Sequence, residues 1–239
     1  MDSIISVALP VYNQNEILPV ALESLCRQKN PGKWELIICS EDDVTSVIDS
    51  YAYRLHENGC VRIKMDHLEE WIPLPKKWKR IGAQMLPESI GMMLQSGDCF
   101  GHERRIELAR AAMTLGFDWY HERYGYFFDI ASFTLAEYCK KENHTHLNMC
   151  MAAKHARNIP ESDLRKNIDY FLLNSIPHPK IYTHEVNMGG VDFNGSQNIS
   201  NSRGAMIAEY RYPFRKVAKK VTEILPHEIL SIALNAKKR

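Results

Sequence analysis

Short apolar runs alternate with helix-like patterns along the first part of the chain. Residues 4–10 and 34–39 are rich in β-branched residues and predict buried strands, and residues 60–65 alternate like a third strand. Between these runs, apolar positions spaced by three and four predict one helix from residue 16 and another over residues 45–57. Strands and helices in strict alternation predict right-handed crossovers and a parallel sheet.

A further buried strand, at residues 90–94, runs into a polar loop that holds two glycines and one carboxylate, Asp98. The pattern after the loop predicts a helix from residue 103 to residue 113. Open α/β sheets bind ligands at the carboxyl ends of their strands, so this loop is the predicted binding crevice. The preceding segment, residues 66–87, is basic and interrupted by prolines, and no element is predicted in it.

The alternation of strand and helix patterns stops after residue 116, where an aromatic-rich stretch has no helical period. We interpret this stretch as two strands, at about residues 119–123 and 126–130, which are expected to pair as an antiparallel hairpin. Helices are predicted further on, at residues 148–156, at 161–173 and, with a break at Pro226, at 217–236. No internal repeat or low-complexity linker interrupts the chain, so residues 1–239 are expected to form one domain.

Composition and charge narrow the class of protein without pointing to a partner. The chain has 239 residues, of which 45% are hydrophobic and 25% charged, as is ordinary for a soluble globular protein. A net charge of +1 gives no overall attraction to nucleic acid or to an anionic membrane. Two basic runs, residues 75–80 and 211–239, are interpreted first as solvated faces.

Cysteine usage and the first residues bear on location. Six cysteines are scattered without a CxxC pair and lie in apolar patterns, which favours reduced thiols over a disulfide frame or a zinc site. A strand pattern follows Met1 almost at once, so no signal peptide is expected. No apolar run reaches the roughly 18 residues of a membrane span. We therefore expect a soluble, cytoplasmic protein.

Three stretches of the first half carry a family pattern. They are Ser6-Val7-Ala8-Leu9-Pro10-Val11-Tyr12-Asn13, continued by Leu18, residues 21–25 and Gln28; then residues 34–38; then Leu94-Gln95-Ser96-Gly97-Asp98. In this order and spacing they resemble family-2 glycosyltransferases with the GT-A fold. The resemblance implies an α/β, GT-A-like fold with a Rossmann-like, mostly parallel sheet flanked by helices, an antiparallel hairpin and C-terminal helices. Residues 1–115 would form the nucleotide-sugar-binding half and residues 116–239 the acceptor half.

The resemblance implies a nucleotide-sugar donor, with a UDP-sugar as the expected class. The turn from Pro10 to Asn13 offers backbone groups and the Tyr12 ring to the base. The family then has an Asp-Asp pair after the second strand, where this chain has Ser40 and Glu41 followed by Asp42, so Glu41 or Asp42 takes that role. A solvated acidic loop is the alternative interpretation. The predicted donor-binding residues are Pro10, Tyr12, Asn13, Glu41, Asp42, Gln95 and Asp98.

The family's acidic triplet implies Mn²⁺ or Mg²⁺ on the donor's diphosphate, because a hard cation takes oxygen ligands and offsets leaving-group charge. Gln95 and Gly97 replace two of the three carboxylates, so Asp98 alone is the predicted metal ligand. Phosphates and waters could complete the site. His184 is a candidate distal ligand. The alternative is that basic residues replace the metal's charge, with Lys76, Lys77, Lys79 and Arg80 as candidates.

The resemblance also implies inversion at the sugar and a general base that deprotonates the acceptor hydroxyl. The family takes this base from an acid near a helix start in the second half, often in a Glu-Asp pair. Asn167-Ile168-Asp169-Tyr170 is the nearest match, which makes Asp169 the predicted catalytic residue, with Asp163 as second choice. Glu122 and Asp129, on the expected aromatic hairpin, are alternatives.

The second half is similar to short family-2 transferases encoded by bacteriophages, some of which glycosylate hydroxymethylated bases in viral DNA. Aromatic residues beside basic runs suit a flipped base and a phosphate backbone, although a core or sugar-stacking role suits them as well. A glycan or protein acceptor, a non-catalytic nucleotide- or glycan-binding relic and a nucleotidyltransferase are the other hypotheses. The predicted acceptor-binding residues are Trp119, Glu122, Tyr124, Asn198 and Arg203.

Overall fold

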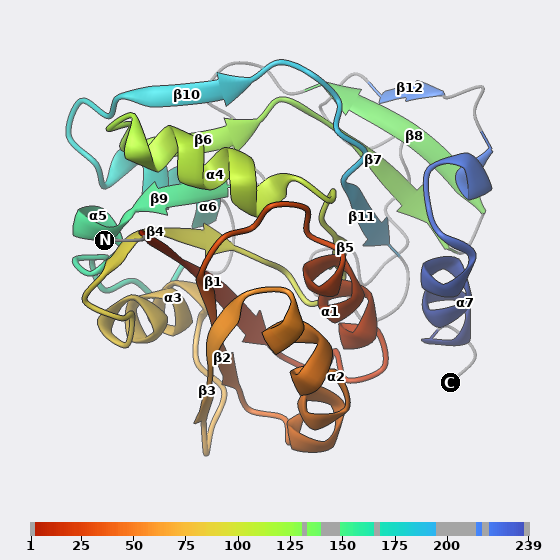
Figure 1. The fold of residues 1–239 in the computed structure, drawn as a ribbon, viewed down its shortest axis with the longest axis horizontal. Helices are drawn as coiled ribbons and strands as arrows, with labels where there is room; N and C mark the ends of the chain where they lie inside the picture. Colours follow the sequence, from red (N-terminus) through yellow and green to blue (C-terminus); the bar gives the residue numbers. More distant parts are fainter. Residues whose placement is uncertain are drawn as a thin grey trace.

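A computed structural model describes residues 3–130, 133–139, 149–164, 168–194, 214–216 and 220–236. Its largest element is a seven-stranded sheet with strand order β10-β6-β9-β4-β1-β2-β3 (Figure 1). The strands are β1 (Ile4–Val11), β2 (Trp34–Ser40), β3 (Cys60–His67), β4 (Ser89–Leu94), β6 (Trp119–Glu122), β9 (Met149–Ala152) and β10 (Ile181–His184). Within the described residues, no helix combines the length and the apolar composition that crossing a membrane requires.

The main sheet is parallel except for one strand. β1 pairs in parallel with both β2 and β4, β2 with β3, and β6 with β10, whereas β9 runs antiparallel between β4 and β6. Every residue of β2 is buried and so is nearly every residue of β1, as expected for strands covered on both faces. The predicted parallel βαβ arrangement of the first half is therefore confirmed.

Helices cover both faces of this sheet. One hydrophobic core joins the sheet to α1 (Leu18–Cys26), α2 (Thr45–Glu57) and α4 (Arg105–Thr114). A second core joins the opposite face to α3 (Leu74–Ala83), α5 (Ala153–Ala156) and α6 (Ile168–Asn174). This layering makes the ends of the strands the accessible edges, and the carboxyl ends are where such sheets bind ligands.

A second, five-stranded sheet lies beside the first, with strand order β12-β8-β7-β11-β5 (Figure 1). Its strands are β5 (Cys99–Phe100), β7 (Tyr124–Asp129), β8 (Thr134–Cys139), β11 (Val191–Asn194) and β12 (Phe214–Lys216). A third core joins this sheet to α7 (His227–Ala236) and to the start of α1. β5 follows β4 after a short loop, so the chain crosses from one sheet to the other within residues 95–98.

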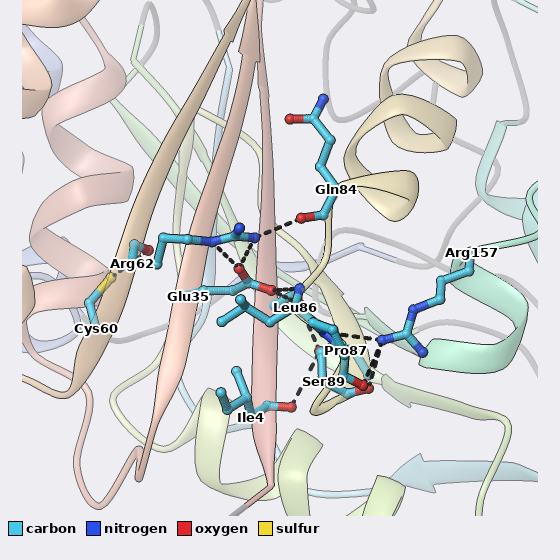
Figure 2. Close-up of polar contacts among 11 residues, drawn as sticks. Ile4, Glu35, Cys60, Arg62, Gln84, Leu86, Pro87, Ser89 and Arg157 are labelled. Atoms are coloured by element: carbon cyan, nitrogen blue, oxygen red, sulfur yellow. Dashed lines mark hydrogen bonds and ion pairs between the residues drawn. The ribbon is translucent and has the colours of Figure 1, made fainter.

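A buried acid holds the amino ends of the central strands together (Figure 2). Glu35 in β2 is fully buried, and its carboxylate accepts hydrogen bonds from Ser6 Oγ at 2.5 Å, Leu86 N at 2.8 Å and Arg62 Nε at 2.8 Å. Arg62 also donates to the carbonyl oxygen of Gln84 at 2.6 Å. The charge is paired and its oxygens have donors, which is the condition for keeping a carboxylate in a core. We interpret this network as structural, since it lies at the opposite end of the strands from the predicted crevice.

Several predicted elements differ from the structure. The antiparallel pairing of residues 119–123 with 126–130 is wrong: β6 pairs with β9 and β10 in the main sheet, and the hairpin is formed by β7 with β8. The helix predicted at 148–156 is wrong for its first half, because β9 inserts there between β4 and β6.

Other differences concern where helices begin. α3 lies in the segment where no element is predicted; Pro73 precedes it and Pro75 lies in its first turn, where proline is compatible with a helix. α6 is described over Ile168–Asn174, and residues 161–164 lie outside any helix. The break at Pro226 is confirmed, with a 3-10 turn, η2 (Val221–Glu223), before it and α7 after it.

Helix α3 touches α5 through Gly82. A Cβ atom built on Gly82 would lie 2.0 Å from the carbonyl oxygen of Ala156, closer than real atoms approach. We expect Gly82→Ala to lower the free energy of unfolding by about 1–3 kcal/mol, the usual cost of overpacking, although alanine favours a helix by about 1 kcal/mol over glycine. Chemical denaturation measures the change. Ala83→Gly, at the exposed neighbouring position, is the control and reports propensity alone. A stabilised Gly82→Ala protein would contradict the close approach of the two helices.

Candidate functional site

The carboxyl ends of β1, β2 and β3 meet at one edge of the main sheet. The strand register places Val11 opposite Ser40, and Ser40 opposite His67. The loops that leave these three strands therefore start side by side. They bring together the predicted residues Tyr12 and Asn13 after β1 and the predicted acids Glu41 and Asp42 after β2.

A buried lysine ties these loops together. Lys77 of α3 is 3% exposed, and its Nζ donates to the carbonyl oxygen of Val11 at 2.7 Å. The same ammonium forms an ion pair with Glu41. The other oxygen of Glu41 accepts a hydrogen bond from the backbone N–H of Ile72 at 3.1 Å. Glu41 is thus engaged by the protein on both oxygens and acts as a structural anchor, which leaves Asp42 as the acid with the freer carboxylate.

Asn13 and Asp42 form the next layer of the site. Asn13 adopts a left-handed backbone conformation, φ 52°, in which asparagine is tolerated better than most residues. Its backbone N–H donates to the carboxylate of Asp42. The Ser40 hydroxyl accepts from the Asp42 N–H at 3.0 Å and so shapes the turn that presents this acid. Asp42 is half-buried and lies close to the polypeptide that carries Tyr12.

Two aromatic side chains border these polar groups. Tyr12 is 37% exposed and Trp71, in the loop between β3 and α3, is 39% exposed. Their ring centroids lie 6.4 Å apart and their planes are inclined by 68°. The Lys77 ammonium lies 5.5 Å from the centre of the Tyr12 ring. Aromatic surface, one acid and a backbone turn are therefore gathered at the predicted donor end of the sheet.

The loop after β4 is fixed by a buried arginine. Arg105 of α4 is 1% exposed and donates to the carbonyl oxygen of Leu94 and to Oε1 of Gln95. The amide nitrogen of Gln95 donates to the carbonyl oxygens of Ser96, at 2.7 Å, and Cys99, at 3.0 Å. Gln95 is itself 2% exposed, so its amide shapes the loop from inside. The predicted contact of Gln95 with the donor has no support in this arrangement.

Asp98 also points into the protein. It is 3% exposed, and its carboxylate accepts from the Ser96 hydroxyl and from the Cys99 thiol, whose sulfur lies 3.5 Å away. The Cys99 sulfur is also 3.2 Å from Oδ1 of Asp192 on β11. Burial raises the pKa of Asp98, and the negative charge of Asp192 raises it further, against the two hydrogen bonds. A carboxyl in this setting holds its proton more tightly than one in water.

The predicted metal site was tested against these contacts. A divalent cation takes several oxygen ligands at once. In the described parts of the chain, no three His, Cys, Asp or Glu side chains are grouped so that they could hold one. The place of a side chain at Gly97 is filled, because a Cβ there would lie 2.7 Å from Oε1 of Gln14. Since Asp98 turns inward as well, the described residues do not fit the predicted Mn²⁺ or Mg²⁺.

The basic run in α3 is also not arranged to replace the charge of a metal ion on the donor's diphosphate. Each of its four cations has an acidic partner, and the pairs are Lys76–Asp163, Lys77–Glu41, Lys79–Glu161 and Arg80–Asp66. Their charge is largely offset within the protein. The interpretation of this run as a solvated face changes accordingly: Lys77 is buried, and the other three cations form ion pairs at the surface of the fold.

The predicted acceptor residues are less well gathered. Trp119 is fully buried in the core under α3, α5 and α6. Glu122 is buried too; its Oε1 lies 2.6 Å from Nε2 of His102 and accepts the Tyr120 hydroxyl at 3.0 Å. Tyr124 is half-buried at the start of β7. Asn198 and Arg203 lie outside the described residues.

The other candidate bases belong to other parts of the chain. Asp169 belongs to α6, and its side chain lies outside the part that the structure describes. Asp163 is exposed and forms the ion pair with Lys76, and Asp129 is buried at the end of β7. His184, the candidate distal ligand, has its pKa lowered mainly by burial. It lies opposite Glu122 in the register of the main sheet, whereas Asp98 lies in the loop between β4 and β5.

Sequence reasoning missed three residues that shape the site. Trp71 lies in a segment without periodicity, so no pattern drew attention to it. Arg105 and His102 read as ordinary surface residues near a helix start, and their burial comes from contacts with residues 10 to 20 positions away. In the sequence, the signal that could have pointed to Trp71 is a tryptophan shortly before two prolines, Pro73 and Pro75.

Comparison of the sequence finds no similar protein, whereas comparison of the structure finds several. No protein-family model and no curated protein matches the chain. The crystal structure of S. aureus TarS 1–349 in complex with UDP-GlcNAc has a TM-score of 0.63 and 12% identity, over 82% of this chain and 60% of that chain. The same TarS chain in complex with UDP has a TM-score of 0.62 and 14% identity, over 80% and 60%.

A third structure is the mannosyltransferase PcManGT from Pyrobaculum calidifontis in complex with GDP-Man and Mn²⁺. Its TM-score is 0.55 and its identity 12%, over 85% of this chain and 58% of that chain. The present chain thus spans about 60% of the TarS 1–349 chain. Likeness at such identities shows the fold alone, and the predicted fold class is confirmed: the chain has the GT-A glycosyltransferase fold.

Removal of the buried arginine should unfold the loop after β4. We expect Arg105→Leu to lower the free energy of unfolding by about 3–5 kcal/mol, because it leaves buried acceptors at Leu94 and Gln95 without their donor. Arg104→Leu is the matched control: this neighbour is exposed and forms a surface ion pair with Glu107, so its loss should cost about 0.5 kcal/mol or less. Thermal and denaturant unfolding measure both. Equal effects at the two positions would show that Arg105 does not hold the loop.

The buried carboxyl of Asp98 is expected to lower the free energy of unfolding at neutral pH. Its folded-state pKa is raised, so the folded protein loses stability relative to the unfolded chain as the pH rises through that pKa. Asp98→Asn removes the buried charge and is expected to raise the free energy of unfolding near pH 8, where the same carboxyl is ionised in the unfolded chain. The gain should shrink near pH 4. A variant that is less stable than the wild type at both pH values would contradict the buried, proton-holding carboxyl.

Proposed function

We propose that this protein is a glycosyltransferase that moves a sugar from a nucleotide-sugar donor to a hydroxyl acceptor. One observation carries the proposal: Tyr12, Asn13 and Asp42 meet at the carboxyl ends of β1 and β2 in a GT-A fold. This is the edge at which open α/β sheets bind nucleotides. TarS and PcManGT, which share the fold, were solved with UDP-GlcNAc and with GDP-Man.

The donor half of the proposal runs from residue 1 to residue 115. Asp42 accepts a hydrogen bond from an N–H or O–H of the base or ribose, and the Tyr12 ring provides a flat apolar contact. A UDP-sugar is the proposed donor. Pro10 and Asn13 contribute the backbone of the turn. Gln95, Asp98 and Glu41 support the site from inside, which the contacts of these residues favour over direct binding.

In the transfer step, a bond forms between the acceptor oxygen and the anomeric carbon, and the bond from that carbon to the diphosphate breaks. The acceptor's proton passes to a carboxylate. Asp169 is the proposed base, and inversion at the sugar follows if attack and departure are in line. The acceptor half, residues 116–239, would include Tyr124, Asn198 and Arg203. No metal ion enters this scheme, because the described residues do not fit one.

The acceptor's identity is proposed at the level of a hydroxyl group. Hydroxymethylated DNA, as in the phage enzymes, is one candidate, and a glycan or protein is the other. The ion pairs of the basic run in α3 weaken the argument for a DNA backbone there, because DNA affinity rises with the number of cations that are free to neutralise phosphates. A nucleotide-binding protein without turnover is the second candidate function, favoured by the inward-facing Asp98 and the amide at position 95.

Donor turnover gives the direct test. The protein is incubated with a panel of UDP- and GDP-sugars, with Mn²⁺, Mg²⁺ or EDTA, and release of the nucleoside diphosphate is followed with and without candidate acceptors. We expect Asp42→Asn to weaken donor binding about tenfold, equivalent to about 1.4 kcal/mol. Asp43→Asn is the matched control, since the neighbouring Asp43 is exposed and accepts from the Thr45 N–H at 3.0 Å.

The outcomes separate the two candidate functions. Turnover that requires Asp42 supports the transferase. Tight nucleotide binding without turnover of any donor, even with acceptors present, favours the binding protein. Absence of both binding and turnover would overturn the proposal. A mass shift of hydroxymethylated DNA, compared with unmodified DNA, decides for or against the DNA acceptor.

A further inference from the structure

Trp71 is the exposed member of the protein's four tryptophans. Trp34 and Trp119 are fully buried and Trp78 is 3% exposed, whereas Trp71 is 39% exposed. A large apolar ring at the surface loses the free energy that burial would give it. Neither the family pattern nor the sequence analysis assigns a role to this residue.

The loop that carries Trp71 is anchored. The backbone N–H of the next residue, Ile72, donates to Oε1 of Glu41 at 3.1 Å, and Glu41 is held in turn by the buried Lys77. Lys77 also binds the carbonyl oxygen of Val11, directly before Tyr12. One buried ammonium therefore positions the backbone next to both aromatic residues. The two loops that carry the rings are thus joined through Lys77 and Glu41.

The geometry of the pair suits a flat ligand. The planes of Tyr12 and Trp71 are inclined by 68° at a centroid separation of 6.4 Å, so the rings form two walls of a corner instead of a closed stack. Each of the two residues is more than a third exposed. The carboxylate of Asp42 is held to the backbone N–H of Asn13, immediately after Tyr12, so an acceptor for N–H groups lies next to the corner.

We propose that Trp71 and Tyr12 together receive the nucleobase of the donor, with Trp71 as the stacking residue that the sequence pattern does not reveal. The proposal rests on the proposed function and deepens it. A nucleobase is flat, offers two aromatic faces and carries N–H groups for Asp42, which matches the aromatic walls and the acid. Lys77 and Glu41 are positioning residues that act through the two loops. Stacking of one base on an aromatic side chain is strong enough to affect affinity measurably.

Trp71 supplies its own reporter. Because the other three tryptophans are buried, emission that acrylamide can quench comes mainly from Trp71. We expect UDP, UMP or uridine to quench this emission and to protect it from acrylamide. Ribose 5-phosphate and pyrophosphate, which lack a base, should do neither. Isothermal titration calorimetry with UDP gives the affinity independently of fluorescence.

Two variants of Trp71 and one control complete the test. Trp71→Ala should lower UDP affinity roughly 5- to 150-fold, the range that loss of one stacking contact implies. Trp71→Phe should lose the fluorescence response while retaining affinity to within about fivefold, since phenylalanine still stacks. Tyr53→Ala is the matched control, because Tyr53 is 73% exposed on α2 and its hydroxyl donates to Glu57 within the same helix. Melting temperatures show whether each variant folds.

The results distinguish the two proposals. The inference on Trp71 is overturned, while the proposed function stands, if UDP binds the wild type and Trp71→Ala with equal affinity. The same holds if the fluorescence of Trp71 does not change when UDP binds. Trp71 would then be a packing contact of its loop. If no nucleotide binds the wild type at any concentration tested, both the inference and the proposed function fall.

Discussion

The ammonium of Lys77 is the contact on which the candidate site depends. It lies in the protein interior, binds the carbonyl oxygen of Val11 and pairs with Glu41. It thereby joins helix α3 to the ends of β1 and β2 and, through Ile72, to the loop that carries Trp71. A buried ammonium is tolerated only because each of these partners is in place, and loss of one partner would cost about 3–5 kcal/mol. The backbone next to Tyr12 and the backbone next to Trp71 are both tied to this one charge.

The main sheet carries a buried charge pair at each end, with different consequences. At the amino ends, Glu35 and Arg62 bind each other and make hydrogen bonds to β1 and to the segment before β4, so their polar atoms are used within the protein. At the carboxyl ends, Lys77 and Glu41 leave aromatic rings and one acid at the surface. The same physical device stabilises the scaffold at one edge and shapes a site at the other.

The loop between the two sheets is held by buried polar contacts. Gln95 stands where the resemblance implies a carboxylate, and its amide binds Arg105 and two loop carbonyls. Gln14 fills the space beside Gly97, and Asp98 faces Cys99 and the second sheet. Buried polar groups in a low dielectric are held firmly when every partner is present. This loop is therefore built for rigidity, and the aromatic corner at β1 is the part of the crevice that offers open surface.

In the first half of the chain, the strands β1 to β4 and the helices α1, α2 and α4 were predictable from the sequence, whereas α3 was not. Strands such as residues 34–39 are buried on both faces, so their apolar runs are continuous and unambiguous. The cluster of Tyr12, Asn13 and Asp42 also followed, because parallel strands end at one edge. Tertiary structure decided the rest. The segment Met149–Ala152 has residues that favour a helix, and only pairing with β4 and β6 makes it a strand. The burial of Lys77 and the placement of the loop with Trp71 depend on the contact between Lys77 and Glu41, which are 36 positions apart. Such long-range contacts leave no periodic signal in the sequence.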